Sequence, residues 1–283
     1  MSKYLIFGNG WLGNKFKDYF GDEAELSSER IEKLEQIRSC IYAIGPQVVI
    51  NCIGKTGKPN IDWCEEHKDE TFFSNVTVPA MMAEACDEIG SGMIHIGSGC
   101  VYEGYQKEWT ENDEPNFFRS FYSKTKIFSE KILSTYDNDV MNDMLILRIR
   151  MPFDSSRSPR NLITKLTSYK QVIGDAQNSM TFIPDMLKAT EMLVEKGQTG
   201  IYNMVNRDAL THREILVAYK YIVDPSFVLP TFIGPSELET RGFVKAGRSN
   251  CVLSTRKLEE AGIEMPFASN ALLRCLNEMG EKK

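Results

Sequence analysis

Short apolar runs alternate with amphipathic helical patterns along the first half of the chain. The apolar runs are 4–7, 48–51, 93–97 and 145–149, and the helical patterns are 11–20, 79–89 and 121–136. Apolar runs of this length are typical of buried strands, and their alternation with helices is typical of βαβ units. Because parallel strands need such crossover connections, the pattern predicts a doubly wound parallel sheet of the α/β class, with about seven strands.

The alternation weakens after residue 151. A polar segment over 154–159 predicts a loop, and a helix is predicted over 161–169. A later helix over 185–196 and a strand over 201–204 are predicted to rejoin the first sheet. We therefore predict a first domain of residues 1–151 that also includes about 180–204, and a smaller C-terminal domain of residues 152–283.

Composition narrows the classes of partner. The 283 residues are 42% hydrophobic, enough for a large core, and the net charge of −6 comes without any basic run. The sequence therefore predicts no nucleic-acid partner. The N-terminal apolar run is too short for a signal peptide, and no run approaches the roughly 18 apolar residues of a membrane span. We expect a cytoplasmic protein with no membrane partner.

The number and spacing of the cysteines bear on disulfides, metal binding and the cellular compartment. The chain has seven of them, scattered and without a CxxC pair or a neighbouring histidine cluster. This spacing predicts no disulfide framework and no metal site, and it fits a reducing compartment.

The segment Gly8-Asn9-Gly10-Trp11-Leu12-Gly13 has the spacing GxGxxG between the first predicted strand and helix. The first glycine permits a tight turn, the second lets the backbone approach a pyrophosphate, and the third allows the helix to pack on the strand. The helix N-terminus attracts the anion. These six residues predict a Rossmann-type dinucleotide site.

The choice of dinucleotide is normally made about 20 residues beyond the glycine loop. Arg30, with the serines at 27 and 28, would hold a ribose phosphate, whereas Glu25 or Glu29 would hold an unphosphorylated ribose. The alternative is that Arg30 is only a solvated helix residue. The sequence favours NADPH and leaves NADH open.

Tyr122 and Lys126 lie four residues apart in a predicted helix and therefore share one face. The ammonium group would favour the phenolate and bind a ribose, and such a tyrosine donates the proton that ketone reduction needs. Ser98 follows the strand 93–97, at the sheet edge where ligands bind, and would hold the substrate oxygen. In an extended strand Ser98 and Cys100 would point into the same pocket.

The glycine loop and the Ser-Tyr-Lys set together resemble the extended short-chain dehydrogenase/reductase family, over essentially the whole chain. Longer segments are similar to the sugar-nucleotide 3,5-epimerase/4-reductases, and less closely to dTDP-4-dehydrorhamnose reductase and GDP-fucose synthase. Those segments are 51–65, 98–100, 121–126, 148–152, 159–165, 178–181 and 248–250. The resemblance implies conversion of UDP-4-keto-6-deoxy-D-glucose to UDP-L-rhamnose with NADPH, the UDP-sugar lying between the two domains.

The resemblance also implies roles that spacing alone leaves open. Cys100 corresponds to the base that removes protons at carbons 3 and 5, and a thiolate forms near neutral pH in an electropositive pocket. Taken alone, Cys100 is more typical of a buried core residue. Lys165 corresponds to the acid that returns the protons, where GDP-fucose synthase has a histidine.

Further ligand residues are expected beside these. The candidate cofactor residues after the strand at 48–51 are Ile53, Gly54 and Lys55. The candidate substrate residues are Thr56, Arg160, Asn161, Lys170 and Arg248. For the surface cations among them, the alternative is an ordinary solvated side chain.

Two other functions stay open from the sequence. One is a reductase similar to dTDP-4-dehydrorhamnose reductase that acts only on an already epimerised sugar, and the other is a non-catalytic NADP-binding regulatory subunit. Gly99 and Cys100 stand where sugar-nucleotide dehydratases have an Asp-Glu pair. We therefore expect a separate 4,6-dehydratase to supply the 4-keto sugar. The family also implies a homodimer.

Overall fold

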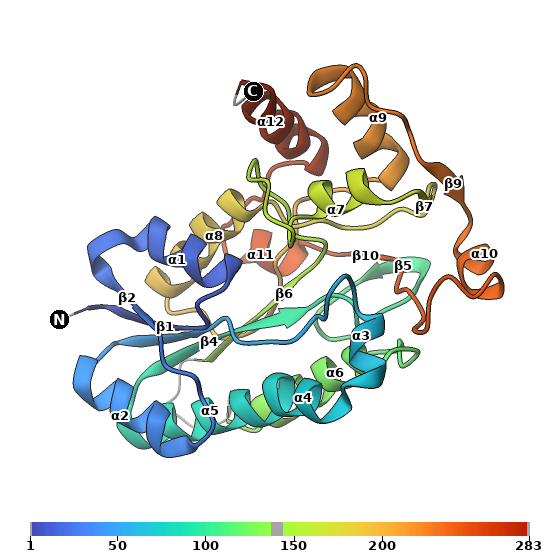
Figure 1. The fold of residues 1–283 in the computed structure, drawn as a ribbon. Coiled ribbons are helices and arrows are strands. Elements are labelled where there is room, and N and C mark those ends of the chain that lie inside the picture. The colour runs from blue at the N-terminus through green and yellow to red at the C-terminus, as the bar shows by residue number, and fades with distance from the viewer. Residues whose placement is uncertain (1, 137–143, 282–283) are drawn as a thin grey trace. The chain divides into compact units, whose positions relative to one another are not determined.

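The central sheet has six strands in the computed structural model, which describes residues 2–136 and 144–281 (Figure 1). Its order is β2-β1-β3-β4-β6-β8. The strands are β1 (Tyr4–Phe7), β2 (Ala24–Ser27), β3 (Val48–Asn51), β4 (Gly92–Ser98), β6 (Met144–Ile149) and β8 (Gly200–Asn203). The fold class predicted from the apolar runs is confirmed, with six strands in this sheet where about seven were expected.

The strand order places the glycine loop at a topological switch point. β1 pairs in parallel with both β2 and β3, so the connection after β1 leads to one side of this strand and the connection after β2 leads back to its other side. In doubly wound sheets, ligands bind outside the carboxyl ends of the strands at this point. The loop after β1 therefore starts at the edge where the loops after β3 and β4 also emerge.

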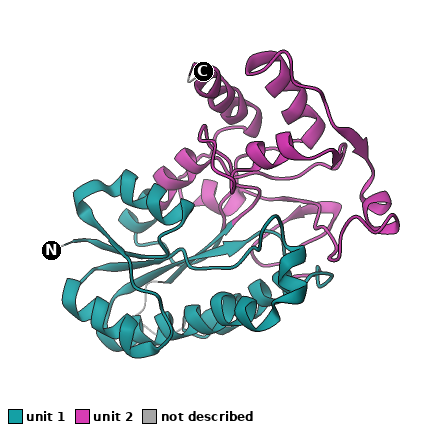
Figure 2. Ribbon diagram, in the orientation of Figure 1, with its two compact units in different colours: residues 1–101, 117–148, 191–202 teal, residues 102–116, 149–190, 203–283 magenta. Residues whose placement is uncertain are grey.

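The chain divides into two compact units (Figure 2). Unit 1 contains residues 1–101, 117–148 and 191–202, and unit 2 contains residues 102–116, 149–190 and 203–283. After residue 148 the chain passes into unit 2 at residue 149, three residues before the predicted start of the second domain at 152, and the return to unit 1 covers 191–202, which is shorter than the predicted return over about 180–204. The segment 102–116 was not predicted to leave the first domain.

Unit 1 packs helices on both faces of the sheet. α2, α5 and α6 cover one face, and α1 lies on the other (Figure 1). Its core includes Phe7, Ile37, Val49 and Met82, all fully buried. Full burial of such side chains contributes about 1.5–3 kcal/mol each. The helices of this unit are α1 (Trp11–Phe20), η1 (Gly21–Glu23), α2 (Leu34–Ile44), α3 (Asp62–Glu66), α4 (Lys68–Phe72), η2 (Phe73–Thr77), α5 (Val78–Ile89) and α6 (Phe121–Leu133).

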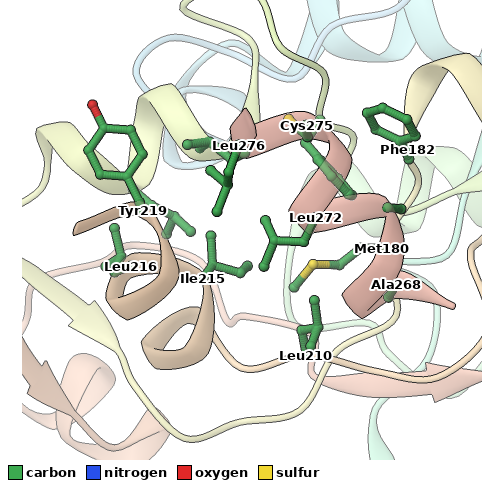
Figure 3. Packing of buried hydrophobic residues seen from close by; sticks show 14 of the residues in the cluster. Met180, Phe182, Leu210, Ile215, Leu216, Tyr219, Ala268, Leu272, Cys275 and Leu276 are labelled. Atoms are coloured by element: carbon green, nitrogen blue, oxygen red, sulfur yellow. The ribbon is translucent and has the colours of Figure 1, made fainter. Parts of the chain in front are cut away.

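Unit 2 has its own apolar core between helices, where Ile215, Leu216, Leu272 and Leu276 pack together (Figure 3). Two small parallel pairs, β5 (Gly104–Trp109) with β10 (Cys251–Leu253) and β7 (Gln171–Ile173) with β9 (Thr231–Ile233), complete the unit. Its remaining helices are α7 (Leu162–Ser168), α9 (His212–Ile222), α10 (Pro235–Thr240), α11 (Arg256–Glu260) and α12 (Ala268–Glu281), and α8 (Ile183–Glu195) runs from unit 2 into unit 1.

Within residues 2–136 and 144–281, no helix is long and apolar enough to cross a bilayer.

Candidate active site

The glycine loop is tight against the protein and open on its outer side. Gly8 has a φ of +104°, and a Cβ there would lie 2.7 Å from the carbonyl carbon of Cys52. A Cβ on Gly13 would lie 2.0 Å from the oxygen of Gly8, so the start of helix α1 packs directly on the loop. A Cβ on Gly10 would meet nothing within 4 Å. The backbone at Gly10 is therefore open to a ligand.

The N-terminus of α1 fits the diphosphate of a dinucleotide. Gly10 is the N-cap and supplies no side-chain cap, while the side-chain Nδ2 of Asn14 donates to Asn9 Oδ1 (2.9 Å) and to the carbonyl oxygen of Gly10 (2.7 Å). Trp11 and Leu12 are half-buried, and Trp11 Nε1 is buried without a hydrogen-bond partner in the described part of the chain. A helix start without a protein anion or cap is suited to bind phosphate.

Arg30 lies in the loop after β2 and not in a helix. Its side chain is 91% exposed and lies 3.5 Å from Glu32. The loop is ordered by Ser27, whose hydroxyl accepts a hydrogen bond from the amide of Glu29 at 3.1 Å. An exposed cation at the end of the second strand is where a ribose phosphate would be recognised.

The loop after β3 is held by a residue that the sequence analysis missed. Asn75, fully buried in the wide helical turn η2, accepts a hydrogen bond from Lys55 N (2.7 Å) and donates one to Lys55 O (3.0 Å). The same amide donates to Thr125 on helix α6 at 3.0 Å. A Cβ on Gly54 would lie 3.9 Å from Lys126 Nζ. The segment Ile53–Thr56 thus runs beside the helix that carries the Tyr-Lys pair.

Ser98 and Cys100 are neighbours, but the predicted geometry was wrong. Strand β4 ends at Ser98, and Cys100 lies in the turn that follows, so the two do not share a strand face. The amide of Cys100 instead donates to Ser98 Oγ at 3.1 Å. Ser98 is 3% exposed and Cys100 is half-buried.

Tyr122 and Lys126 lie one turn apart on α6, as predicted, and both are buried. Burial raises the pKa of Tyr122, proximity to the Cys100 thiol raises it further, and hydrogen bonding with Ser98 lowers it. Burial lowers the pKa of Lys126 to about 8, and Lys126 Nζ donates to the carbonyl of Ile96 at 2.8 Å. Tyr122, Ser98 and Cys100 therefore lie within electrostatic reach of one another.

A second set of buried polar groups joins helix α6 to the strands of the sheet, and no motif in the sequence pointed to it. Arg148 on β6 bonds to both carboxylate oxygens of Glu130, with Nη2 to Oε2 at 2.8 Å. His95 lies 3.1 Å from Asn51 Nδ2 and 3.4 Å from Ser129 Oγ, and burial lowers its pKa well below the usual range. His95 is therefore neutral. Arg148 could have been noticed in the sequence, because it is the first residue of segment 148–152, one of those similar to the sugar-nucleotide 3,5-epimerase/4-reductases.

The N-terminus of α6 is capped by protein groups. Ser120 is the N-cap and accepts from Ser123 N at 3.0 Å. Ser123 Oγ in turn donates to the carbonyl of Cys100 at 2.7 Å. The amide of Phe121 donates to the Glu65 carboxylate at 2.6 Å. The helix start and the Cys100 turn are thereby bonded to each other.

Lys165 lies in α7 of unit 2. Burial lowers its pKa, and the charge of Arg160 lowers it further, so this half-buried amine exchanges protons more readily than an exposed lysine. Asn161 is fully buried and caps α7 by accepting from Ile163 N at 3.1 Å. Its amide group donates to the carbonyls of Asp154 and Ser156, both at 2.6 Å. Asn161 thus anchors the loop that carries Arg160.

The other predicted substrate cations also lie in unit 2. Lys170 is exposed just before β7, while Arg248 is half-buried and donates to a backbone carbonyl two residues earlier at 2.6 Å. Arg150, which the sequence analysis did not single out, is 1% exposed. It donates to the carbonyl of Ser249 at 2.8 Å, to Ser249 Oγ at 3.0 Å and to Asn178 Oδ1. Arg150 therefore holds the segment next to Arg248.

Known proteins resemble this chain over nearly its whole length. An Arabidopsis thaliana protein named bifunctional dTDP-4-dehydrorhamnose 3,5-epimerase/dTDP-4-dehydrorhamnose reductase is 35% identical, across 99% of this chain and 94% of that protein. The trifunctional UDP-glucose 4,6-dehydratase/UDP-4-keto-6-deoxy-D-glucose 3,5-epimerase/UDP-4-keto-L-rhamnose-reductase RHM2 of the same plant is also 35% identical, but this chain spans only 42% of it.

A solved structure agrees with these relatives. The L780 UDP-rhamnose synthase from Acanthamoeba polyphaga mimivirus superposes with a TM-score of 0.88 at 30% identity, covering 98% of this chain and 99% of that one. Residues 4–280 match the RmlD substrate binding domain, so the chain belongs to the RmlD substrate binding domain family.

Proposed function

We propose that this protein is an NADPH-dependent 3,5-epimerase and 4-reductase that converts UDP-4-keto-6-deoxy-D-glucose to UDP-L-rhamnose. The observation that carries the proposal is the grouping around Tyr122 in unit 1. Ser98 hydrogen-bonds the phenol, the Cys100 thiol lies within electrostatic reach of it, and Lys126 is one turn along the same helix. Reduction needs the serine, tyrosine and lysine, and the thiol adds a base that reduction alone does not use.

The epimerase half begins at the carbonyl on carbon 4, which acidifies the protons on carbons 3 and 5. Cys100, as thiolate, takes one of these protons, and the electron pair of the broken C–H bond moves to the carbon-4 oxygen as an enolate. Ser98 and Tyr122 donate hydrogen bonds to that oxygen. We assign to Lys165 the return of a proton to the opposite face, and exchange with water restores both groups.

The reductase half uses the same oxygen. NADPH, when bound at residues 8–13 with Arg30 at its ribose phosphate, supplies the hydride for carbon 4. Tyr122 gives its proton to the carbon-4 oxygen as the alkoxide forms. Because burial and Cys100 raise the pKa of Tyr122, the phenol holds this proton at neutral pH. Lys126 then stabilises the phenolate, since its pKa of about 8 keeps most of it protonated at neutral pH.

The substrate of this reaction is already a ketone, so another enzyme must oxidise and dehydrate the parent sugar. The trifunctional plant relative carries a 4,6-dehydratase in its name, in addition to the activities proposed here. We propose that a separate dehydratase feeds this chain. Arg160, Lys170 and Arg248 are proposed to bind the diphosphate of the sugar nucleotide, and Thr56 to contact the sugar.

The experiment separates the two halves by omitting the cofactor. UDP-4-keto-6-deoxyglucose is incubated with the protein in deuterium oxide without NADPH and followed by NMR against an enzyme-free control. We expect deuterium to enter carbons 3 and 5, and UDP-L-rhamnose to form once NADPH is added. The dTDP-sugar, assayed in parallel, tests the preference for uracil.

Two variants give the matched comparison. Cys100→Ala is expected to abolish exchange, whereas Cys40→Ala, at another half-buried cysteine on α2, is expected to leave it intact. NADPH consumption without any exchange in the wild type would instead identify a reductase only. Absence of both activities with either nucleotide would refute the enzyme class.

A further inference from the structure

The turn that carries Cys100 is held at both of its backbone groups. The Cys100 amide donates to Ser98 Oγ at 3.1 Å, and its carbonyl accepts from Ser123 Oγ at 2.7 Å. The preceding residue is Gly99, whose backbone is less restricted than that of any other residue. The direction of the Cys100 side chain therefore depends on these hydrogen bonds more than on local backbone preference.

The bond from Ser123 is the end of a short buried relay. Ser120 Oγ donates to Ser123 Oγ at 2.8 Å, and Ser123 Oγ donates to the Cys100 carbonyl. Ser120 and Ser123 are 2% and 0% exposed, so water does not compete for these bonds. Successive hydrogen bonds in a dry environment strengthen one another. The relay thus fixes the turn to the first turn of helix α6.

We propose that Ser123 is a positioning residue for the epimerase half of the reaction, a role that rests on the function proposed above. Its hydroxyl sets where the Cys100 thiol stands relative to carbons 3 and 5 of the sugar. Proton abstraction from carbon needs the base close and aligned, and a displacement of about 1 Å can cost roughly a hundredfold in rate. Ser123 itself touches neither the substrate nor the cofactor in this role.

The reductase half depends on Ser123 much less. Tyr122 and Lys126 are side chains of α6 itself, held by the helix backbone, by Thr125 Oγ1 donating to Tyr122 O (2.7 Å) and by Lys126 Nζ donating to Ile96 O. The backbone amide of Ser123 bonds to Ser120 whatever the side chain is. Loss of the hydroxyl should therefore separate the two activities.

The test compares Ser123→Ala with Ser129→Ala. Both serines are buried on α6, but Ser129 lies six residues after Ser123 and contacts His95. Epimerase activity is read as deuterium entry at carbons 3 and 5 without NADPH. Reductase activity is read separately, in reverse, as NADP⁺ reduction by UDP-L-rhamnose, which is already epimerised.

For Ser123→Ala we expect exchange to fall at least about tenfold and the reverse hydride transfer to change by less than about threefold. Ser129→Ala should leave both rates near wild type. Equal losses of the two activities in Ser123→Ala, or no loss of exchange, would overturn the inference.

Should Ser123→Ala not fold, Ser123→Cys replaces it, because a thiol keeps a weaker donor at nearly the same position. The expected result is then a smaller loss that is again confined to exchange, and an equal loss of both activities would overturn the inference. If the wild-type protein itself shows no exchange, the proposed epimerase function fails, which is distinguishable from failure of the Ser123 role.

Discussion

The two regions that hold the candidate functional residues differ in how their side chains are fixed. In unit 1, Ser98, Tyr122 and Lys126 are at most 8% exposed and are held by hydrogen bonds from several elements. In unit 2, the cations Lys170 and Arg248 are exposed or half-buried. Bond-making groups need fixed positions, whereas charge recognition of a diphosphate tolerates movement. The difference fits the proposed roles, in which Ser98, Tyr122 and Lys126 of unit 1 act on carbon 4 and the cations of unit 2 bind the diphosphate. Lys165 is the unit 2 residue that is proposed to transfer a proton.

The largest effect is expected from the phenol in unit 1. Tyr122→Phe removes the proton donor for carbon 4 and should lower NADPH-dependent reduction about a thousandfold, since general acids contribute roughly 10²–10⁴-fold. The rate is measured from loss of nicotinamide absorbance. Deuterium exchange should fall less, because Ser98 still supports the enolate. Reduction at the wild-type rate would contradict the role of the phenol and the contrast between the units.

The next effect concerns what holds the unit 1 site together. Asn75→Ala removes a buried clamp on Lys55 and a bond to Thr125, and should destabilise the protein by about 2–3 kcal/mol. Asn116 makes the same pair of hydrogen bonds to the backbone of Glu103 but is exposed. Asn116→Ala should therefore lower the free energy of unfolding by less than about 1 kcal/mol. Urea denaturation measures both, and equal losses would argue against burial as the cause.

A moderate effect is expected from pH. Lys126 has a pKa of about 8, so the charge that we propose to stabilise the Tyr122 phenolate is lost as the pH rises through that value. Reduction should therefore decline by about tenfold per pH unit above roughly pH 8. In Lys126→Arg the charge persists, and the decline should move to higher pH. A profile that is the same in both proteins would exclude Lys126 as its origin.

The same shift has a consequence for stability. The folded protein releases the Lys126 proton at about pH 8, whereas the ordinary value is 10.5, so between these values the unfolded chain binds more protons. Stability contributed by this group must then rise with pH across that window. Urea unfolding of the wild type against Lys126→Met should show the wild type gaining relative stability from about pH 8 upward.

The smallest effects are expected among the unit 2 cations. Arg248→Ala should raise the KM for the UDP-sugar about five- to tenfold with kcat nearly unchanged, because its guanidinium is already oriented by a backbone bond. Lys170→Ala should change KM by less than about twofold, since an exposed lysine loses little when removed. Steady-state kinetics measure KM for both variants, and a larger rise in KM for Lys170→Ala than for Arg248→Ala would contradict the prediction.

Some parts of this fold and site could be predicted because their signal is local. The glycine loop, the end of the strand at Ser98 and the i, i+4 pair Tyr122 and Lys126 each lie within a few residues of sequence. Periodicity and spacing are sufficient for such features.

The missed residues act over long sequence separations. Asn75 is 20 residues from Lys55 and 50 from Thr125, and Ser123 is 23 from Cys100, so no spacing rule identifies them. Cys100 was misplaced because strand alternation was extended past Gly99, where a side-chain bond to Ser98 replaces the ladder. A serine hydroxyl that accepts from the amide two residues later is a local alternative to the strand ladder, and strand alternation alone does not include it.

Glu65, a residue of helix α3 whose carboxylate lies at the start of α6, affects where an anion can bind within unit 1. Its carboxylate already bonds the Phe121 amide at 2.6 Å, and Ser120 takes the amide of Ser123. Helix α1, in contrast, begins at a glycine with no side-chain cap. A phosphate group is repelled by the Glu65 carboxylate at the start of α6 and is attracted to the uncapped amides at the start of α1. The Glu65 carboxylate thus occupies the start of α6 and leaves the start of α1 as the more favourable place for a phosphate group.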